Sequence, residues 1–159
     1  MVRYSPVLNF VYLSMLFAEG VIGRHFVGAQ TIMLKGNSVL LIKPTYRNTW
    51  EFPGGKVENG EAPETAAVRE TKEEARIFIK KIERKLGTYT YRFMKRECVI
   101  HVYVAKDWDE LDLWKPNMEI AERGFFPVDN LPPDISPATK LRISELFSGS
   151  DKEFSGDWE

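Results

Sequence analysis

Apolar residues occur along the chain in short segments separated by turn residues, a pattern typical of β-strands. An apolar segment at residues 26–34 is followed by Gly36 and Asn37, which signal a turn, and then by a second apolar segment at residues 39–42. These two segments predict neighbouring strands joined by a tight turn. Further strands are predicted at residues 86–93, 98–105 and 124–128.

Two segments favour helices. Pro63 suits the first turn of a helix, where its missing N–H costs nothing, and residues 64–76 are rich in Glu, Ala, Arg and Lys. Ser136 and Pro137 form an N-cap and N1 pair that opens a last helix ending near residue 147. Several strands with two separate helices predict an α+β or layered α/β/α domain.

The 159 residues suit one domain, which we place at residues 24–147, followed by a polar, acidic tail at 148–159. Residues 1–23 include an apolar run, with ten apolar residues among the twelve from 7 to 18. This run is short for a membrane span, which needs about 20 residues. We expect a helix that packs on the domain or on a partner subunit, as in a homodimer, and a membrane-associated segment is the alternative.

Charge and cysteine content narrow the class of protein. The formal net charge of −1 provides no general attraction to nucleic acid or to anionic membranes. The single cysteine, Cys98, excludes an internal disulfide and a zinc site built from cysteines, and it fits a reducing cytoplasm. Tyr89, Tyr91 and Phe93 alternate among basic residues, as in proteins that bind single-stranded nucleic acid. The simpler interpretation is that these aromatic rings face the core and the cations face water.

The residues with the clearest chemistry lie in the helix predicted at about 62–76. Glu70, Glu73 and Glu74 stand at positions i, i+3 and i+4, so they project to one side of the helix. Like charges at this spacing destabilise a helix unless they are neutralised, and a divalent cation would do this. With oxygen ligands and no nearby His or Cys, the pattern favours Mg²⁺ or Mn²⁺ over Zn²⁺. An ordinary solvated glutamate face is the alternative.

The segment before the helix strengthens the prediction of a metal site. Gly54 and Gly55 let the backbone approach a ligand closely and expose a carbonyl oxygen. With these glycines in front, the chain resembles the Nudix box, a motif of fixed spacing that ends in a carboxylate helix. The positions that match the box are Gly55, Glu61, Arg69, Glu70, Glu73, Glu74 and Ile77.

The resemblance to the Nudix family extends over about residues 24–147. It implies an α/β/α sandwich with a mixed β-sheet, a carboxylate helix at about 62–76 and a C-terminal helix at about 137–147. Two positions depart from the motif. Thr71 replaces an aliphatic residue, and Arg76 replaces a glycine that ends the helix in a left-handed conformation. That conformation costs Arg roughly 1 kcal/mol, so we expect either strain at Arg76 or a helix that continues.

By this resemblance the protein is an enzyme, a pyrophosphohydrolase in which water attacks a phosphorus atom of a nucleoside diphosphate linked to another group. Glu70, Glu73, Glu74 and the carbonyl oxygen of Gly54 are implied to hold Mg²⁺, for which Mn²⁺ is a substitute. Glu70 is also the best acceptor in the box for the proton of the water. A small nucleotide is the expected partner, in preference to nucleic acid. The alternative is a catalytically silent module that binds a nucleotide or RNA.

Residues outside the carboxylate helix complete the predicted site. Some family members take a further acid from a later loop, for which we prefer Glu119 slightly over Glu122. Arg69 is expected to pair with a carboxylate of the box, and Glu61 to brace the loop before the helix. Residues that could contact the substrate are Lys43, Arg47, Lys56 and Trp50, each with a surface or packing role as the alternative.

Overall fold

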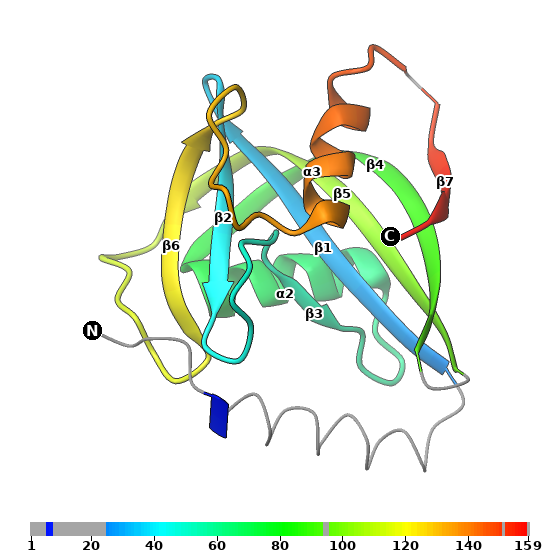
Figure 1. Ribbon diagram of the computed structural model, residues 1–159, viewed down its shortest axis with the longest axis horizontal. Coiled ribbons are helices and arrows are strands. Elements are labelled where there is room, and N and C mark those ends of the chain that lie inside the picture. Colours follow the sequence, from blue (N-terminus) through cyan, green and yellow to red (C-terminus); the bar gives the residue numbers. More distant parts are fainter. Residues whose placement is uncertain (1–5, 8–24, 94–95, 151, 159) are drawn as a thin grey trace.

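The computed structural model describes residues 6–7, 25–93, 96–150 and 152–158. Within these ranges two helices cover opposite faces of one mixed seven-stranded sheet, as Figure 1 shows. The predicted α/β/α sandwich is therefore confirmed. The apolar helix predicted within residues 1–23 lies outside the described residues, apart from residues 6–7. In the part of the chain that is described, no helix is both long and apolar enough to cross a membrane.

The elements follow one another with short connections. Their bounds are β1 His25–Lys35, β2 Ser38–Pro44, β3 Gly54–Lys56, α2 Pro63–Ala75, β4 Ile77–Phe93, β5 Arg96–Glu110, β6 Ile120–Pro127, α3 Pro137–Leu146 and β7 Phe154–Asp157.

The sheet has the order β6-β2-β1-β5-β4-β7, with β3 paired to β1. Strand β1 runs parallel to β5 over most of its length, and β4 runs parallel to β7, while the other pairs are antiparallel. Strand β3 pairs with the middle of β1, where Gly54 lies opposite Gln30 and Gly55 opposite Ala29. This pairing fixes the two glycines of the motif at the sheet, next to the helix that follows them.

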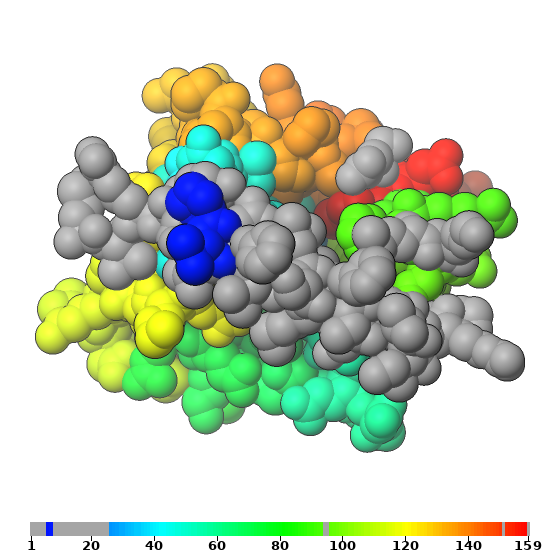
Figure 2. All heavy atoms as spheres, turned by 60° about the horizontal axis from the view of Figure 1, so that its bottom comes forward, coloured from blue at the N-terminus to red at the C-terminus, as the bar shows by residue number. Residues whose placement is uncertain are grey.

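Alternation along β5 divides the core into two parts. Val102 and Val104 belong to a cluster that includes Ile143 of α3, whereas Tyr103, between them, belongs to a cluster that includes Ala66 of α2. Because successive side chains of a strand point to opposite faces, each helix covers one set. Figure 2 shows the outside of the molecule from another direction, with the segments of α3 and β7 along one edge and those of α2 and the start of β4 along the opposite edge.

Helix α2 begins at Pro63, as predicted, and ends at Ala75. Arg76 follows with φ 55° and ψ 41°, so of the two expected outcomes the left-handed one is observed and the helix does not continue into β4. The Arg76 guanidinium makes two bonds to the carboxylate of Asp112, at 3.0 and 2.7 Å. The buried hydroxyl of Thr71 donates to the Ala67 carbonyl at 2.8 Å, which accommodates the polar residue in the helix.

Residues after β5 satisfy the carbonyl groups at the end of α2. The Trp114 indole N–H donates to the Glu74 carbonyl at 2.8 Å, and the Arg123 guanidinium donates to the Ala75 carbonyl. Such carbonyls have no partner within a helix, so these bonds hold the last turn in place. The loop after β5 is thereby tied to the turn that carries Glu74.

The C-terminal tail contributes strand β7, which the sequence did not predict. It pairs with β4 and places Trp158 near Arg142, whose guanidinium lies 3.8 Å from the ring centre of Tyr89 and 5.5 Å from that of Trp158. Tyr89 is buried and Tyr91 packs against the same core cluster, as the simpler interpretation of the aromatic residues in β4 expects. For Phe93 that interpretation is wrong, because this ring, at the end of β4, is 36% exposed.

Candidate active site

The two glycines of the motif bring the backbone of β3 against helix α2. A Cβ atom at Gly55 would lie 2.6 Å from the carboxyl carbon of Glu70, so only glycine leaves room for that carboxylate. A Cβ atom at Gly54 would lie 2.2 Å from the carbonyl oxygen of Ala29 on β1. Both distances are far below van der Waals contact. The glycines therefore allow an acidic side chain and a neighbouring strand to pack directly on the backbone.

Glu74 is the most deeply buried acid of the helix, with 3% of its surface exposed. Its Oε2 accepts a hydrogen bond from the Gly54 N–H at 2.8 Å. Burial raises the pKa of Glu74 well above its usual value, and the negative charges of Glu70, Glu119 and Glu51 raise it further. The carboxylates of Glu70, Glu119 and Glu51 are therefore close enough to Glu74 for their charges to affect its ionisation.

Glu70 lies next to this position, with 14% of its side chain exposed. Burial raises its pKa, the bond from Arg69 opposes that rise, and the charges of Glu73 and Glu119 add to it. A buried carboxylate with a raised pKa is a better proton acceptor near neutral pH than an ordinary one. The role of Glu70 as acceptor of the water proton stays a prediction.

Arg69 ties the loop to the helix. Its guanidinium makes two bonds of 3.0 Å to Glu61, one of 2.8 Å to Glu70 and one of 3.0 Å to the carbonyl oxygen of Lys56. These bonds raise the pKa of Arg69, chiefly through Glu61. The expected pairing of Arg69 and the bracing position of Glu61 are both present.

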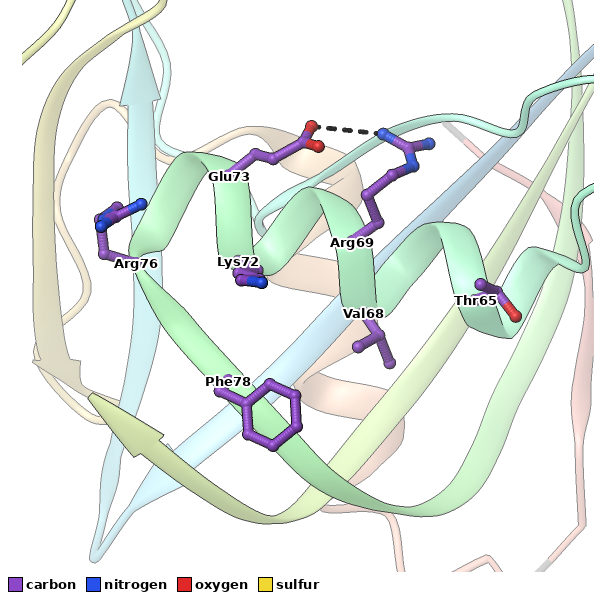
Figure 3. Close-up of a pocket in the computed structure, with 7 residues that line it drawn as sticks. All are labelled: Thr65, Val68, Arg69, Lys72, Glu73, Arg76 and Phe78. Atoms are coloured by element: carbon purple, nitrogen blue, oxygen red, sulfur yellow. Dashed lines mark hydrogen bonds and ion pairs between the residues drawn. The ribbon is translucent and has the colours of Figure 1, made fainter. Parts of the chain in front are cut away.

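Glu73 is placed differently from its two neighbours. Its side chain is 57% exposed and lies 3.3 Å from Arg69, toward which it reaches along the surface in Figure 3. It lines a groove of about 420 Å³ on the outer side of α2, together with Arg69, Lys72, Arg76 and other residues. Glu70 and Glu74 do not line this groove. The helical spacing of the three acids therefore leads to two buried carboxylates and one exposed one.

Glu119 lies within electrostatic reach of both buried acids, since its charge raises the pKa of Glu70 and of Glu74. The loop that carries it is held in place: the Thr45 N–H donates to the Glu119 carbonyl at 2.8 Å, and the Asn117 side chain accepts from the Glu119 N–H at 2.8 Å. Glu122 lies on β6 in register with Lys43 and is exposed. Of the two acids considered from this region, Glu119 is the one whose charge affects the pKa of Glu70 and Glu74. Its side chain is exposed, and its part in the site stays a prediction.

The predicted substrate contacts fall into two groups. Arg47 is 46% exposed and donates to Glu51 at 3.1 Å, and the Lys56 side chain is exposed close to the motif. Trp50, in contrast, is buried and packs edge-to-face on Phe126 with ring centres 4.6 Å apart. The ring of Trp50 therefore packs in the core and is not available at the surface to stack on a base. Lys43 pairs with Asp134 and lies 5.9 Å from the ring centre of Trp50.

Glu51 is a site residue that the sequence analysis missed. Trp50 and Phe52, on either side of it, both belong to the core cluster on the α3 side. Side chains in an extended segment alternate, so the residue between two core aromatics faces the other way, toward α2. That alternation in the sequence was the signal that could have identified Glu51.

The arrangement of acids fits a hard divalent cation. Glu70 and Glu74 are largely shielded from solvent, the charge of Glu70 raises the pKa of Glu74, and both side chains offer only oxygen atoms as donors. Within the described ranges, no three Asp, Glu, His or Cys side chains converge closely enough to hold an ion by themselves. This is compatible with Mg²⁺, which usually binds one or two carboxylates and completes its shell with water and substrate phosphates.

Fold and site together define a class: an α/β/α sandwich in which one acidic helix packs on a glycine-containing strand. The comparison with protein families agrees, since the model for the NUDIX domain matches residues 24–147. The chain therefore belongs to the NUDIX family.

The sequences of curated relatives align with part of this chain. An ADP-ribose pyrophosphatase from Bacillus subtilis is 36% identical over 86 residues, which are 54% of this chain and 44% of the relative. An ADP-ribose pyrophosphatase from Methanocaldococcus jannaschii is 36% identical over 110 residues, 67% of this chain and 64% of the relative. An 8-oxo-dGTP diphosphatase from Proteus vulgaris is 33% identical over 86 residues, 52% of this chain and 76% of the relative. The chain thus spans less than two thirds of either ADP-ribose pyrophosphatase.

Solved structures share the fold. The crystal structure of a MutT NUDIX hydrolase from Burkholderia pseudomallei superposes with a TM-score of 0.69 at 26% identity, covering 78% of this chain and 99% of the other. A UDP-X diphosphatase superposes with a TM-score of 0.65 at 21% identity, covering 91% and 75%, a likeness that shows the fold alone.

Proposed function

We propose that the protein is a divalent-metal-dependent pyrophosphohydrolase that cleaves a pyrophosphate bond in a nucleoside diphosphate linked to another group. The observation that carries this proposal is the packing of two buried, mutually repelling carboxylates, Glu70 and Glu74, against Gly54 and Gly55. The relatives named ADP-ribose pyrophosphatase and 8-oxo-dGTP diphosphatase support the substrate class.

Glu70 and Glu74, the carbonyl oxygen of Gly54 and the carboxylate of Glu119 would hold the metal, and Mg²⁺ is the ion we propose. Glu73 would contribute from the exposed side of the helix. When bound, Mg²⁺ supplies charge neutralisation for the phosphates and lowers the pKa of a bound water.

The side chains then have separate tasks. Glu70 would accept the proton of the attacking water at a carboxylate oxygen. Arg69 keeps Glu70 and the loop residue Glu61 in fixed positions. Arg47 and Lys56 would bind phosphate oxygens from the open side, where both side chains are exposed.

Hydrolysis of a panel of nucleotides tests this proposal. We would incubate the protein with ADP-ribose, 8-oxo-dGTP and a UDP-sugar, with Mg²⁺ or Mn²⁺, and measure the release of nucleoside monophosphate and phosphate. Glu70→Gln and Glu74→Gln are expected to lose about 100-fold or more in kcat, since each removes a charge at the reacting site. Glu64→Gln, an exposed position on the same helix, is the matched control and keeps full activity.

Two results would overturn the proposal. One is full turnover by both Gln variants. The other is tight binding of these nucleotides without any product, which would indicate a binding module that keeps the fold without catalysis.

A further inference from the structure

Beside the acidic site, Glu51 and Arg47 form an ion pair that the proposed function does not yet use. We infer that Glu51 is a positioning residue that holds the Arg47 guanidinium toward the phosphates of the substrate. This inference rests on the proposed function, because it assigns a specific task to a residue at the same site.

The backbone directs Glu51 to the α2 side of the sheet. Its N–H and C=O both bond to Ile42 of β2, at 2.9 Å each, so the two residues form a directly opposed pair. Opposed residues in an antiparallel pair point to the same face, and Ile42 belongs to the core cluster that includes Ala75 of α2. The Glu51 carboxylate therefore lies on the same face as Glu74, which is consistent with its effect on the charge state of Glu74.

A contribution to the stability of the fold does not explain why a carboxylate occupies position 51. The Glu51 side chain is only 13% exposed, and its charge adds to the repulsion among the acids of the site. Shielding a carboxylate from water costs desolvation that the attraction of its partner often does not recover, and here the partner, Arg47, is half-exposed. An apolar residue of similar length would pack here without that cost. A position that costs stability beside a reactive site favours a functional role.

The backbone around Arg47 is fixed by hydrogen bonds to the loop that carries Glu119. Arg47 lies in the connection between β2 and β3, two residues after Thr45, whose N–H and hydroxyl bond to the carbonyls of Glu119 and Met118 at 2.8 and 2.7 Å. The connection is thus fastened to the loop that carries Glu119. Arg47 remains 46% exposed while its Nη1 donates to Glu51 at 3.1 Å.

A guanidinium has five N–H donors in a planar fork, so this group can bond to a carboxylate and bind a phosphate at the same time. Immobilising a long, flexible Arg side chain costs conformational entropy. Because Glu51 restricts Arg47 before the ligand arrives, part of that cost falls on folding and not on binding. Loss of Glu51 should therefore weaken phosphate binding only as long as Arg47 is present.

A double-mutant cycle tests this dependence. We would measure the binding of inorganic pyrophosphate in Mg²⁺ by calorimetry for the unsubstituted protein, Arg47→Met, Glu51→Met and the double variant. Each single variant is expected to bind about tenfold more weakly, and the double variant no more weakly than Arg47→Met alone. Glu51→Gln keeps an acceptor for Arg47 and should lose less. Asp112→Asn, which breaks the ion pair with Arg76, is the matched control and should bind pyrophosphate normally.

Kinetics on ADP-ribose add a second readout. The Glu51 variants should raise KM with kcat within about twofold of the unsubstituted value, since Glu51 does not touch the reacting atoms. Their melting temperatures should stay level or rise.

The inference is overturned by additive losses in the double variant, by unchanged pyrophosphate binding in Glu51→Met, or by a loss confined to kcat. Absence of pyrophosphate binding in the unsubstituted protein would also overturn it. If pyrophosphate binds but no nucleotide is hydrolysed, the proposed function is wrong. The double-mutant cycle would still show whether Glu51 acts through Arg47.

Discussion

The position of the Glu70 carboxylate depends on the absence of a side chain at Gly55. The carboxylate occupies the space that any other residue at position 55 would fill, because a Cβ there would lie 2.6 Å from its carboxyl carbon. The side chain can move only by breaking its bond to Arg69. The glycine of the motif is thus required by the position of an acid 15 positions later in the chain.

The substitution Gly55→Ala is therefore expected to displace Glu70 without unfolding the domain. We predict a fall in kcat of about 100-fold, since a shift of about 1 Å in a catalytic group has effects of this size. Gly36→Ala is the control, because Gly36 has φ +60° and open space around it. That variant should lose about 1 kcal/mol of stability and no activity. Normal kcat in Gly55→Ala would contradict the assigned position of Glu70.

Glu74 gives a second prediction at the same scale, through its pKa. Burial raises that pKa above the value of 4.5 in an unfolded chain, so the folded protein binds this proton more tightly. Without metal, ionised Glu74 therefore lowers the stability of the folded protein at pH values above its folded pKa. At acid pH the carboxyl is protonated in both states, and this loss of stability disappears. Glu70 acts in the same direction.

In EDTA, Glu74→Gln should therefore raise the melting temperature by about 3 °C at pH 8, which corresponds to roughly 1 kcal/mol. At pH 5 the gain should be smaller. Mg²⁺ should reverse the order at pH 8, because the metal stabilises only the protein that keeps the carboxylate. An equal effect of the substitution at both pH values would show that the charge of Glu74 is not the cause.

At the scale of elements, the end of helix α2 determines where the acids of its last turn lie. The helix stops at Arg76 in a left-handed conformation, and side chains from Trp114 and Arg123 bind the carbonyls of Glu74 and Ala75. A glycine usually occupies the left-handed position. Here the residue in that position is Arg76, whose exposed guanidinium makes two bonds to the Asp112 carboxylate.

The strain at Arg76 can be measured by comparing two substitutions. Arg76→Ala removes the ion pair and keeps the strain, whereas Arg76→Gly removes both. We predict that Arg76→Gly is more stable than Arg76→Ala by about 1 kcal/mol in urea unfolding. Equal stability of the two variants would mean that the left-handed conformation costs nothing at this position.

The elements also show what the sequence could predict. Pro63 and the fixed spacing of the motif located α2 to within a residue or two, because both are local signals. The start of β4 at Ile77 was not predicted, since its first half is rich in lysine and its pairing with β5 shifts register several times, which disturbs the alternation. Strand β7 was missed because four residues form a strand only by pairing with distant β4.

At the scale of the whole molecule, the sheet separates two environments. The α3 side contains the larger apolar core, with Trp50 and Phe52, while the α2 side contains the acids. The site is assembled from four segments: β3, α2, the connection after β2 and the loop after β5. Spacing along the chain identified Glu70, Glu73 and Glu74 as one set, and the family resemblance suggested Glu119. Only the fold shows that Glu51 faces the α2 side and that Glu73 stays at the surface.

The central claim is that this assembly holds a divalent ion through Glu70 and Glu74, and Mn²⁺ binding tests it most directly. We would titrate Mn²⁺ into the unsubstituted protein and into the double variant Glu70→Gln/Glu74→Gln, and measure free Mn²⁺ by electron paramagnetic resonance. The account predicts a bound ion in the unsubstituted protein and an affinity at least about tenfold lower in the variant. Equal Mn²⁺ affinity in the two proteins would contradict it.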